Sequence, residues 1–351
     1  MNKKKQDFIE ESEEKELYEH YRFVVDKGQG LLRIDKYLMD RIENASRNKI
    51  QGAAAHGNIL VNGVSVKPSY KVKPDDLITI MMEDPVREIK LFPQDIPLDV
   101  VYEDDDLIVV NKPTGMVVHP AYGNYSGTLV NALLFHFEKN AGKNPGKLAS
   151  GPFLVHRIDK DTSGLMMVAK NEIAQVRLQS QFYHHTIDRK YVAMVWGDLK
   201  AESGTIEGHV GRHKTMRKLF TVYEDGSKGK HAVTHYKVIE RFGYVSLVEC
   251  ELETGRTHQI RVHLKHLGHP LFNDETYGGS HILRGTTFSR YQQFVNNCFK
   301  ICSRQALHAK SLGFDHPTTG EHLFFESDLA ADMQELIEKW RNYAVHKLLD
   351  P

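Results

Sequence analysis

The chain has 351 residues, of which 40% are apolar, and this suffices for one or two globular domains. It has no run of about eighteen apolar residues, so no membrane span is expected. No apolar stretch follows the first lysines, so no secretory signal is expected either. Net charge is zero, which excludes a strongly basic nucleic-acid binder, although acidic ends flank a mildly basic middle at residues 30–80 and 186–270. Three cysteines without a Cys-x-x-Cys pair predict a reducing, cytoplasmic compartment.

The first part of the chain predicts a charged tail followed by a small compact domain. Residues 1–20 are rich in charge and carry little apolar periodicity, so a disordered or loosely helical tail is expected there. Within residues 21–84, apolar spacing over 32–38 predicts one helix, and Ser46 is the expected N-cap of a second. Asn62-Gly63 is a strong hairpin signal, and a strand over 77–80 closes the domain.

This helix-helix-hairpin pattern resembles the S4 domain, a small RNA-binding module with mixed helices and strands. The resemblance rests on R-I-D-K-Y-L, S-R-N-K-I, G-N-I-L-V-N-G and K-P-D-D-L-I-T-I, all within residues 30–82. It implies that basic side chains on this domain contact RNA phosphates, since a small basic surface recognises backbone charge; a solvated charged face is the alternative. The candidate contacts are Arg33, Lys36, Arg47, Lys49 and Lys67.

Prolines and mixed charge predict a linker over residues 85–96, before a second domain at residues 97–346. Its expected elements are a strand at 107–110, a turn followed by a strand at 112–120, an exposed loop at 138–151 and an amphipathic helix at 326–343. Alternating runs at 191–196, 232–239 and 245–252 indicate a largely antiparallel sheet. Together with the first domain, these elements predict an α+β protein.

Residues 155–170, V-H-R-I-D-K-D-T-S-G-L-M-M-V-A-K, form the most informative segment. Asp159 follows Arg157 and precedes a Thr-Ser-Gly turn, and the apolar run Leu165–Ala169 predicts a buried strand. Taken alone, Asp159 would more often be a turn residue bonded to its own backbone. A carboxylate between basic residues at the edge of a core strand instead suggests a functional site.

The whole string resembles the signature H-R-L-D-x-x-T-S-G of the RluA-type pseudouridine synthases, with Ile158 at the leucine position. Three further segments resemble that family in the same order: K-P-T-G-M-V-V-H-P at 112–120, D-R-K-Y-V-A-M-V-W-G at 188–197 and E-T-G-R-T-H-Q-I-R-V-H-L at 253–264. The resemblance implies a catalytic domain with a large mixed, mainly antiparallel sheet flanked by helices.

The resemblance also implies a reaction: the N-glycosidic bond of a uridine in RNA breaks, and C5 of the uracil joins C1′, without any cofactor or metal. Asp159 is the implied catalytic carboxylate, and whether it attacks the base, attacks the sugar or removes a proton stays open. Arg261, in a helix expected over 257–267, is its implied partner. Tyr191 would stack on the uracil or relay a proton, and Arg157 would fill the space that the base leaves. His156 is expected to support the turn.

Within this family, residues 123–134, 156–166 and 303–309 are most similar to the RluD-type branch, which implies large-subunit (23S) ribosomal RNA as the partner and its helix 69 stem-loop as the target. A basic loop is expected at 205–219. Other ribosomal sites, tRNA, and a role as an RNA-binding ribosome assembly factor remain alternatives, and nothing in the sequence demands more than a monomer.

A zinc site is the rival interpretation of one segment. Four histidines lie within twelve residues, and a helical spacing of three can present two imidazoles to a metal ion. A zinc-dependent hydrolase is nevertheless disfavoured, because the segment has no His-Glu-x-x-His and no cysteine pair nearby. The four residues are His258, His263, His266 and His269.

Overall fold

A computed structural model describes residues 18–42, 45–82, 91–121, 123–141, 151–216 and 219–349. The chain divides into two compact units, residues 1–89 and 90–351. Most of the expected tail at 1–20 and the start of the expected linker at 85–96 lie outside the described residues. The tail prediction is wrong for its last three residues, because the first strand already begins at Tyr18 and pairs with a later strand of the same unit. No described helix has the length and apolarity to cross a bilayer.

The N-terminal unit is a four-stranded antiparallel sheet with two short helices. The strand order is β1 (Tyr18–Val24), β4 (Leu77–Met82), β2 (Ile59–Val61) and β3 (Val64–Ser65), and the helices are α1 (Ile34–Met39) and α2 (Arg47–Ala55). Ser46 caps α2 by accepting a hydrogen bond from the Lys49 N–H, as the sequence predicts. Asn62 and Gly63 both have positive φ, as a tight hairpin between β2 and β3 requires.

A buried carboxylate joins the two helices of this unit. Asp35 is fully buried and accepts hydrogen bonds from Arg33, Arg47 and Gln51 at 2.7–3.1 Å. The hydrogen bonds from Arg33 hold the pKa of Asp35 well below its usual range. Both arginines therefore have a structural partner, while their side chains remain 40% and 47% exposed.

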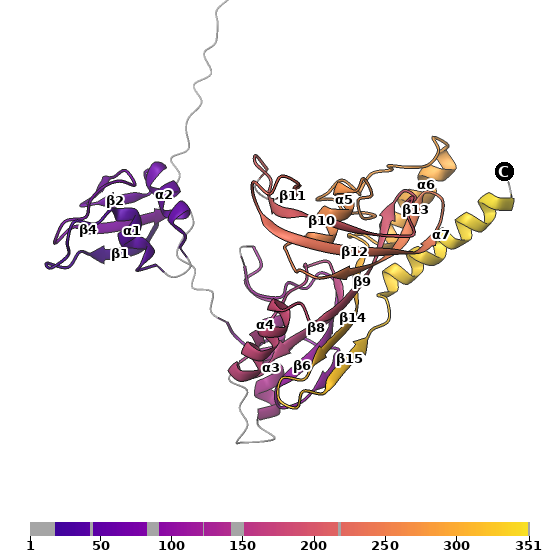
Figure 1. The fold of residues 1–351 in the computed structure, drawn as a ribbon, viewed down its shortest axis with the longest axis horizontal. Coiled ribbons are helices and arrows are strands. Elements are labelled where there is room, and N and C mark those ends of the chain that lie inside the picture. The colour runs from indigo at the N-terminus through magenta and orange to yellow at the C-terminus, as the bar shows by residue number, and fades with distance from the viewer. Residues whose placement is uncertain are drawn as a thin grey trace, which may run out of the picture. The chain divides into compact units, whose positions relative to one another are not determined.

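The C-terminal unit contains an eleven-stranded mixed sheet (Figure 1). All strand pairs are antiparallel except that of β14 (Leu307–Asp315) with β8 (Ser163–Ala169). The order is β11 (Phe220–Tyr223), β10 (Ser203–Arg212), β12 (Lys230–Arg241), β13 (Val245–Leu252), β9 (Asp188–Trp196), β14, β8, β6 (Leu107–Lys112) and β5 (Val100–Glu103), with β15 (His322–Glu326) on β14 and β7 (Phe153–Leu154) on β8.

Helices cover both faces of this sheet, so its central strands are buried on both sides. Along β9, Tyr191, Ala193 and Val195 pack into one core, and the alternate residues pack into another. The first core includes α3 (Leu129–Ala141) and α5 (Gln259–His266), and the second includes α6 (Ser289–Ile301) and α7 (Ala331–Leu349). A third core receives α4 (Glu172–Tyr183). The α+β prediction and the mainly antiparallel sheet are confirmed.

Four further local predictions are wrong. The loop expected at 138–151 is helical up to Ala141, where α3 ends, and residues 142–150 lie outside the described part of the chain. Residues 113–120 form no strand, because Pro113 and Met116 direct their carbonyls to the Lys112 ammonium rather than to a neighbouring strand. The last helix begins at Ala331 rather than at 326, because β15 pairs with β14 up to Glu326. Residues 205–212 belong to strand β10, so the basic loop expected at 205–219 is shorter.

We predict that Asp35→Ala lowers the free energy of unfolding of the N-terminal unit by about 1–3 kcal/mol, since three donors lose their acceptor. Because folding lowers the pKa of Asp35, its contribution is complete above about pH 5, begins to fall near the unfolded pKa of about 4, and is lost fully only as the pH reaches the lower folded pKa. Urea unfolding at pH 7 and pH 3 measures both effects. An equal difference between wild type and variant at the two pH values would contradict this assignment.

Candidate active site

The loop before β8 carries Asp159 and is fixed through its backbone. The Lys112 ammonium donates to the Lys160 carbonyl at 3.0 Å, and the Arg304 guanidinium donates to the Asp161 carbonyl at 2.9 Å. Both cationic side chains are buried, and burial lowers the pKa of Lys112 to about 7. The Thr162 N–H closes a turn onto the Asp159 carbonyl. Two elements distant in sequence therefore position Asp159.

The last residue of the Thr-Ser-Gly turn, Gly164, must be a glycine. Its φ is +108°, and a Cβ there would lie 2.2 Å from the Ala309 carbonyl oxygen, so no other residue fits. This close approach lets β8 leave the loop and pair with β14. As the sequence predicts, His156 supports the loop: its Nε2 accepts a hydrogen bond from the Met167 N–H, and burial lowers its pKa to about 3.

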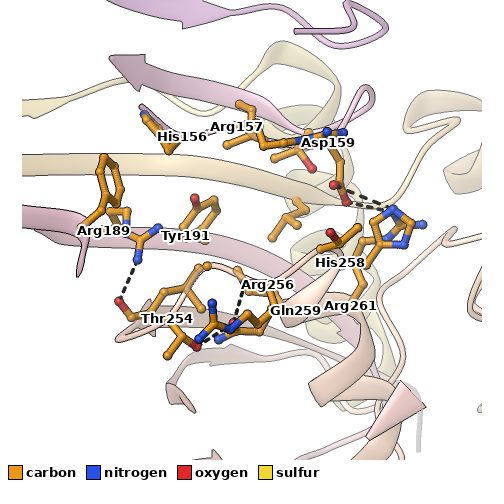
Figure 2. Close-up of a pocket in the computed structure, with 18 of the residues that line it drawn as sticks. His156, Arg157, Asp159, Arg189, Tyr191, Thr254, Arg256, His258, Gln259 and Arg261 are labelled. Carbon is orange, nitrogen blue, oxygen red and sulfur yellow. Dashed lines mark hydrogen bonds and ion pairs between the residues drawn. The ribbon is translucent and has the colours of Figure 1, made fainter. Parts of the chain in front are cut away.

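An ion-pair chain holds the Asp159 carboxylate. Arg261 donates from Nη1 to Asp159 Oδ2 at 2.9 Å, and from Nε and Nη2 to the two oxygens of Asp274 at 2.7 and 2.9 Å. Asp274 is fully buried, whereas the Asp159 side chain is 20% exposed to the cavity. The bidentate pair fixes the guanidinium plane, which leaves Nη1 directed at Asp159 (Figure 2).

His258 and Tyr277 complete this side of the site. His258 precedes α5 in a left-handed conformation, with φ 57°, and its Nδ1 lies 2.8 Å from the Tyr277 hydroxyl. Its Nε2 lies 3.9 Å from Asp159 Oδ1. The Tyr277 ring also lies 5.0 Å from the Arg261 guanidinium carbon, in cation–π range. A non-glycine residue in this backbone region is a recurrent feature of functional sites.

Asp159, Arg261 and Tyr191 line one cavity of about 500 Å³, large enough for a nucleoside. Tyr191 projects from β9 between the Asp159 loop and α5 (Figure 2). It is buried, and burial raises the pKa of its hydroxyl, so at neutral pH the phenol keeps its proton. The exposed side chain of Arg157 lies at the same cavity. The structure therefore brings together four of the predicted residues.

The five predicted phosphate contacts lie on the N-terminal unit. Four of them are exposed, and Arg33 is half-buried against Asp35. The four exposed residues are Lys36, Arg47, Lys49 and Lys67.

The histidine cluster does not form a metal site among the described residues. His258 binds Tyr277, and His269 Nδ1 lies 2.8 Å from the Trp196 carbonyl. His266 faces Glu224, and His263 is fully buried with neither ring nitrogen bonded. The side chains diverge instead of converging on one point.

Comparison with known proteins decides the family. The sequence model described as RNA pseudouridylate synthase matches residues 106–266, and that of the S4 domain matches residues 32–78. An uncharacterized RNA pseudouridine synthase of Chlorobaculum parvum is 49% identical over 319 residues, which are 90% of this chain and 96% of that protein. The chain belongs to the RNA pseudouridine synthase family.

Two other relatives extend this comparison. The ribosomal large subunit pseudouridine synthase D of Zymomonas mobilis is 42% identical over 314 residues, 87% of this chain and 93% of that synthase. The structure of human RNA pseudouridylate synthase domain containing 4 superposes with a TM-score of 0.52 at 22% identity, covering 69% of this chain and 92% of that one, and shows the same fold. This protein is therefore a pseudouridine synthase, an isomerase that acts on RNA, with an N-terminal S4 domain.

Sequence reasoning missed several groups of this synthase's site. Asp274 follows Arg261 by thirteen residues in H-P-L-F-N-D, and an Asn-Asp pair after two apolar residues was the available signal. Lys112 and Arg304 lie in segments that carry the family resemblance, but nothing in those segments shows that both side chains bind the Asp159 loop. The contacts of His258 with Tyr277 and Asp159 were not predicted either.

We predict that Lys112→Met lowers the rate of pseudouridine formation about 10–100-fold, because the Asp159 loop loses one backbone anchor and small displacements of a reacting group are costly. Three carbonyls lose their donor, so the free energy of unfolding falls by about 1–3 kcal/mol. Thermal unfolding and single-turnover kinetics measure the two effects. Lys200→Met, at an exposed lysine, is the matched control. Full activity in the Lys112 variant would contradict the anchoring role.

Proposed function

We propose that this synthase converts uridines of large-subunit ribosomal RNA to pseudouridine, with the helix 69 stem-loop as its target. The observation that carries the chemistry is the pairing of Asp159 with Arg261 inside a nucleoside-sized cavity. The choice of RNA is supported by the relatives named ribosomal large subunit pseudouridine synthase D, which are 41–42% identical over most of their length.

The proposed reaction balances without a further reactant. The C1′–N1 bond breaks, the uracil turns, the C1′–C5 bond forms, the hydrogen on C5 leaves as a proton and N1 takes up a proton. The Asp159 carboxylate, paired with Arg261, is the nucleophile or the base for these steps. The Arg261 guanidinium keeps the carboxylate in place and compensates its charge in a cavity where the Asp159 side chain is 20% exposed.

The target uridine must leave its stack to enter this cavity, at a cost of a few kcal/mol. Stacking of the uracil on the Tyr191 ring would offset part of that cost, roughly 1–3 kcal/mol. The protonated phenol also has a hydrogen to donate to a carbonyl oxygen. Arg157, exposed at the cavity, is placed to fill the gap that the base leaves in the RNA.

The S4 domain would hold the RNA backbone. Its exposed cations are Lys36, Arg47, Lys49 and Lys67, with Arg33 as a half-buried neighbour. Contacts of this kind give affinity that falls with salt and carry little sequence information. We propose that the synthase acts as a monomer in the cytoplasm.

Two alternatives give different outcomes in the experiments below. Related synthases modify tRNA or other ribosomal sites, and a chain of this kind could act mainly as an RNA-binding assembly factor. The complete set of Asp159, Tyr191 and Arg261 around one cavity favours an active enzyme over a binding protein.

We predict that Asp159→Asn abolishes pseudouridine formation, a loss of at least about a thousandfold, while RNA affinity changes less than about threefold. The substitution keeps the shape of the side chain and removes its charge, so Arg261 loses one of its two ionic partners but the RNA surface is unchanged. Tritium release from [5-³H]uridine-labelled RNA and filter binding give the two values. Residual turnover near the wild-type rate would exclude Asp159 as the catalytic group.

Cells lacking the gene test the target. Carbodiimide-dependent primer extension across all ribosomal RNA is compared after restoring the wild type or the Asp159→Asn variant. Stops in helix 69 that are absent from the deletion and return only with the wild type would establish the proposal. Unchanged ribosomal stops would refute the ribosomal target and favour tRNA, whereas growth defects rescued equally by both proteins would favour the assembly-factor alternative.

A further inference from the structure

Arg189 is a second buried arginine of the cavity, distinct from the one that holds Asp159. It lies on β9 two residues before Tyr191, so both side chains project from the same face of the strand. Its side chain lines the cavity and is only 6% exposed. The guanidinium lies between the Phe182 ring, 5.0 Å from its central carbon, and Gly255, where a Cβ would lie 3.1 Å from Nη1 (Figure 2).

The hydrogen bonds of Arg189 leave its charge uncompensated. Nη2 reaches the Leu252 carbonyl at 3.5 Å, the limit of a hydrogen bond, and the buried Nε has no partner. Among the described residues no carboxylate forms an ion pair with it. The other buried arginines are fully paired, Arg261 with two aspartates and Arg304 with Asp332.

A buried cation without an anion destabilises the fold, because its lost hydration is not replaced. Consistent with this, burial lowers the pKa of Arg189. A guanidinium still keeps its proton in proteins, so the cavity carries this positive charge permanently. Because Arg189 lowers the stability of the free protein, the negatively charged partner of its guanidinium is expected to arrive with the substrate.

We propose that Arg189 stabilises the negative charge that develops on the uracil carbonyl oxygens during isomerisation. Cleavage of the C1′–N1 bond leaves its electron pair on the uracil, which delocalises it onto the carbonyl oxygens. Addition of a nucleophile to C6 would equally place charge on O4. The charge disappears when the uracil bonds C1′ through C5, after which the C5 proton leaves and N1 takes up a proton. Arg189 therefore fits either route, and the proposal rests on the uridine isomerisation described above.

The position of Arg189 favours the base over an RNA phosphate. It shares its face of β9 with Tyr191, the ring placed to stack on the uracil, and its side chain is almost entirely withdrawn from solvent. Arg157, in contrast, is exposed, as a side chain that meets the RNA outside the cavity should be. Donors preorganised in a dry site stabilise developing charge better than water does.

Arg189→Met tests the proposal by separating stability from chemistry. We expect the single-turnover rate at saturating enzyme to fall about 10²–10³-fold, the effect typical of losing one oxyanion donor. The melting temperature should stay unchanged or rise, because an unpaired buried charge is replaced by an apolar chain of similar length. The matched control is Lys190→Gln, which removes a charge from the opposite face of β9 and should leave both values unchanged.

The assay uses [5-³H]uridine-labelled total RNA and ribosomal subunits from cells lacking the gene, so that tritium release reports whichever RNA is modified. Release from tRNA alone would refute the ribosomal target and leave the Arg189 comparison intact. Gly255→Ala keeps the charge but displaces the guanidinium by a few tenths of an ångström, and a lower rate at unchanged melting temperature would support the proposal.

Three results would overturn the assignment of Arg189. An unchanged single-turnover rate in Arg189→Met would show that the charge takes no part in the reaction. A weaker RNA affinity with a normal rate at saturation would make Arg189 a phosphate contact instead. If Arg189→Met lowers the melting temperature and the rate in proportion, and Arg189→Lys restores neither the melting temperature nor the rate, Arg189 has a purely structural role.

Discussion

The site depends on one shared guanidinium. Arg261 binds Asp274 through two hydrogen bonds and Asp159 through a third. The buried carboxylate of Asp274 therefore orients Arg261, and Arg261 in turn orients the reactive carboxylate of Asp159. Helix α5 supplies the arginine, and a turn after it supplies Asp274. The rest of the unit serves this arrangement: β14 and β6 hold the Asp159 loop, and β9 places Tyr191 across the cavity.

Local patterns predicted most of the fold. Asn62-Gly63 has the backbone of a tight hairpin, Ser46 caps its helix, and the apolar run from Leu165 forms a strand buried along its whole length. Errors occurred where tertiary contacts override local preference. The carbonyls of Pro113 and Met116 bind an ammonium instead of a strand, which no periodicity can reveal.

The candidate site was predicted to the extent that the family motifs cover it. Asp159, Tyr191 and Arg261 were named from their segments, and the structure places them around one cavity. Asp274 and the unpaired state of Arg189 were not predicted, because they depend on which distant segments meet. Likewise, Arg33 and Arg47 were expected to contact RNA or to form a solvated face, and their shared bond to Asp35 is a structural role that spacing does not reveal.

A double-mutant cycle of Arg261→Gln and Asp274→Asn tests most directly whether Asp274 acts on catalysis through Arg261. Single-turnover tritium release is measured for the wild type, both single variants and the double variant, with turnover followed for hours where it is slow. If Asp274 only positions Arg261, Asp274→Asn lowers the rate in the wild type and has no further effect once Arg261 is gone. Rate losses that multiply in the double variant would contradict the chain from Asp274 through Arg261 to Asp159.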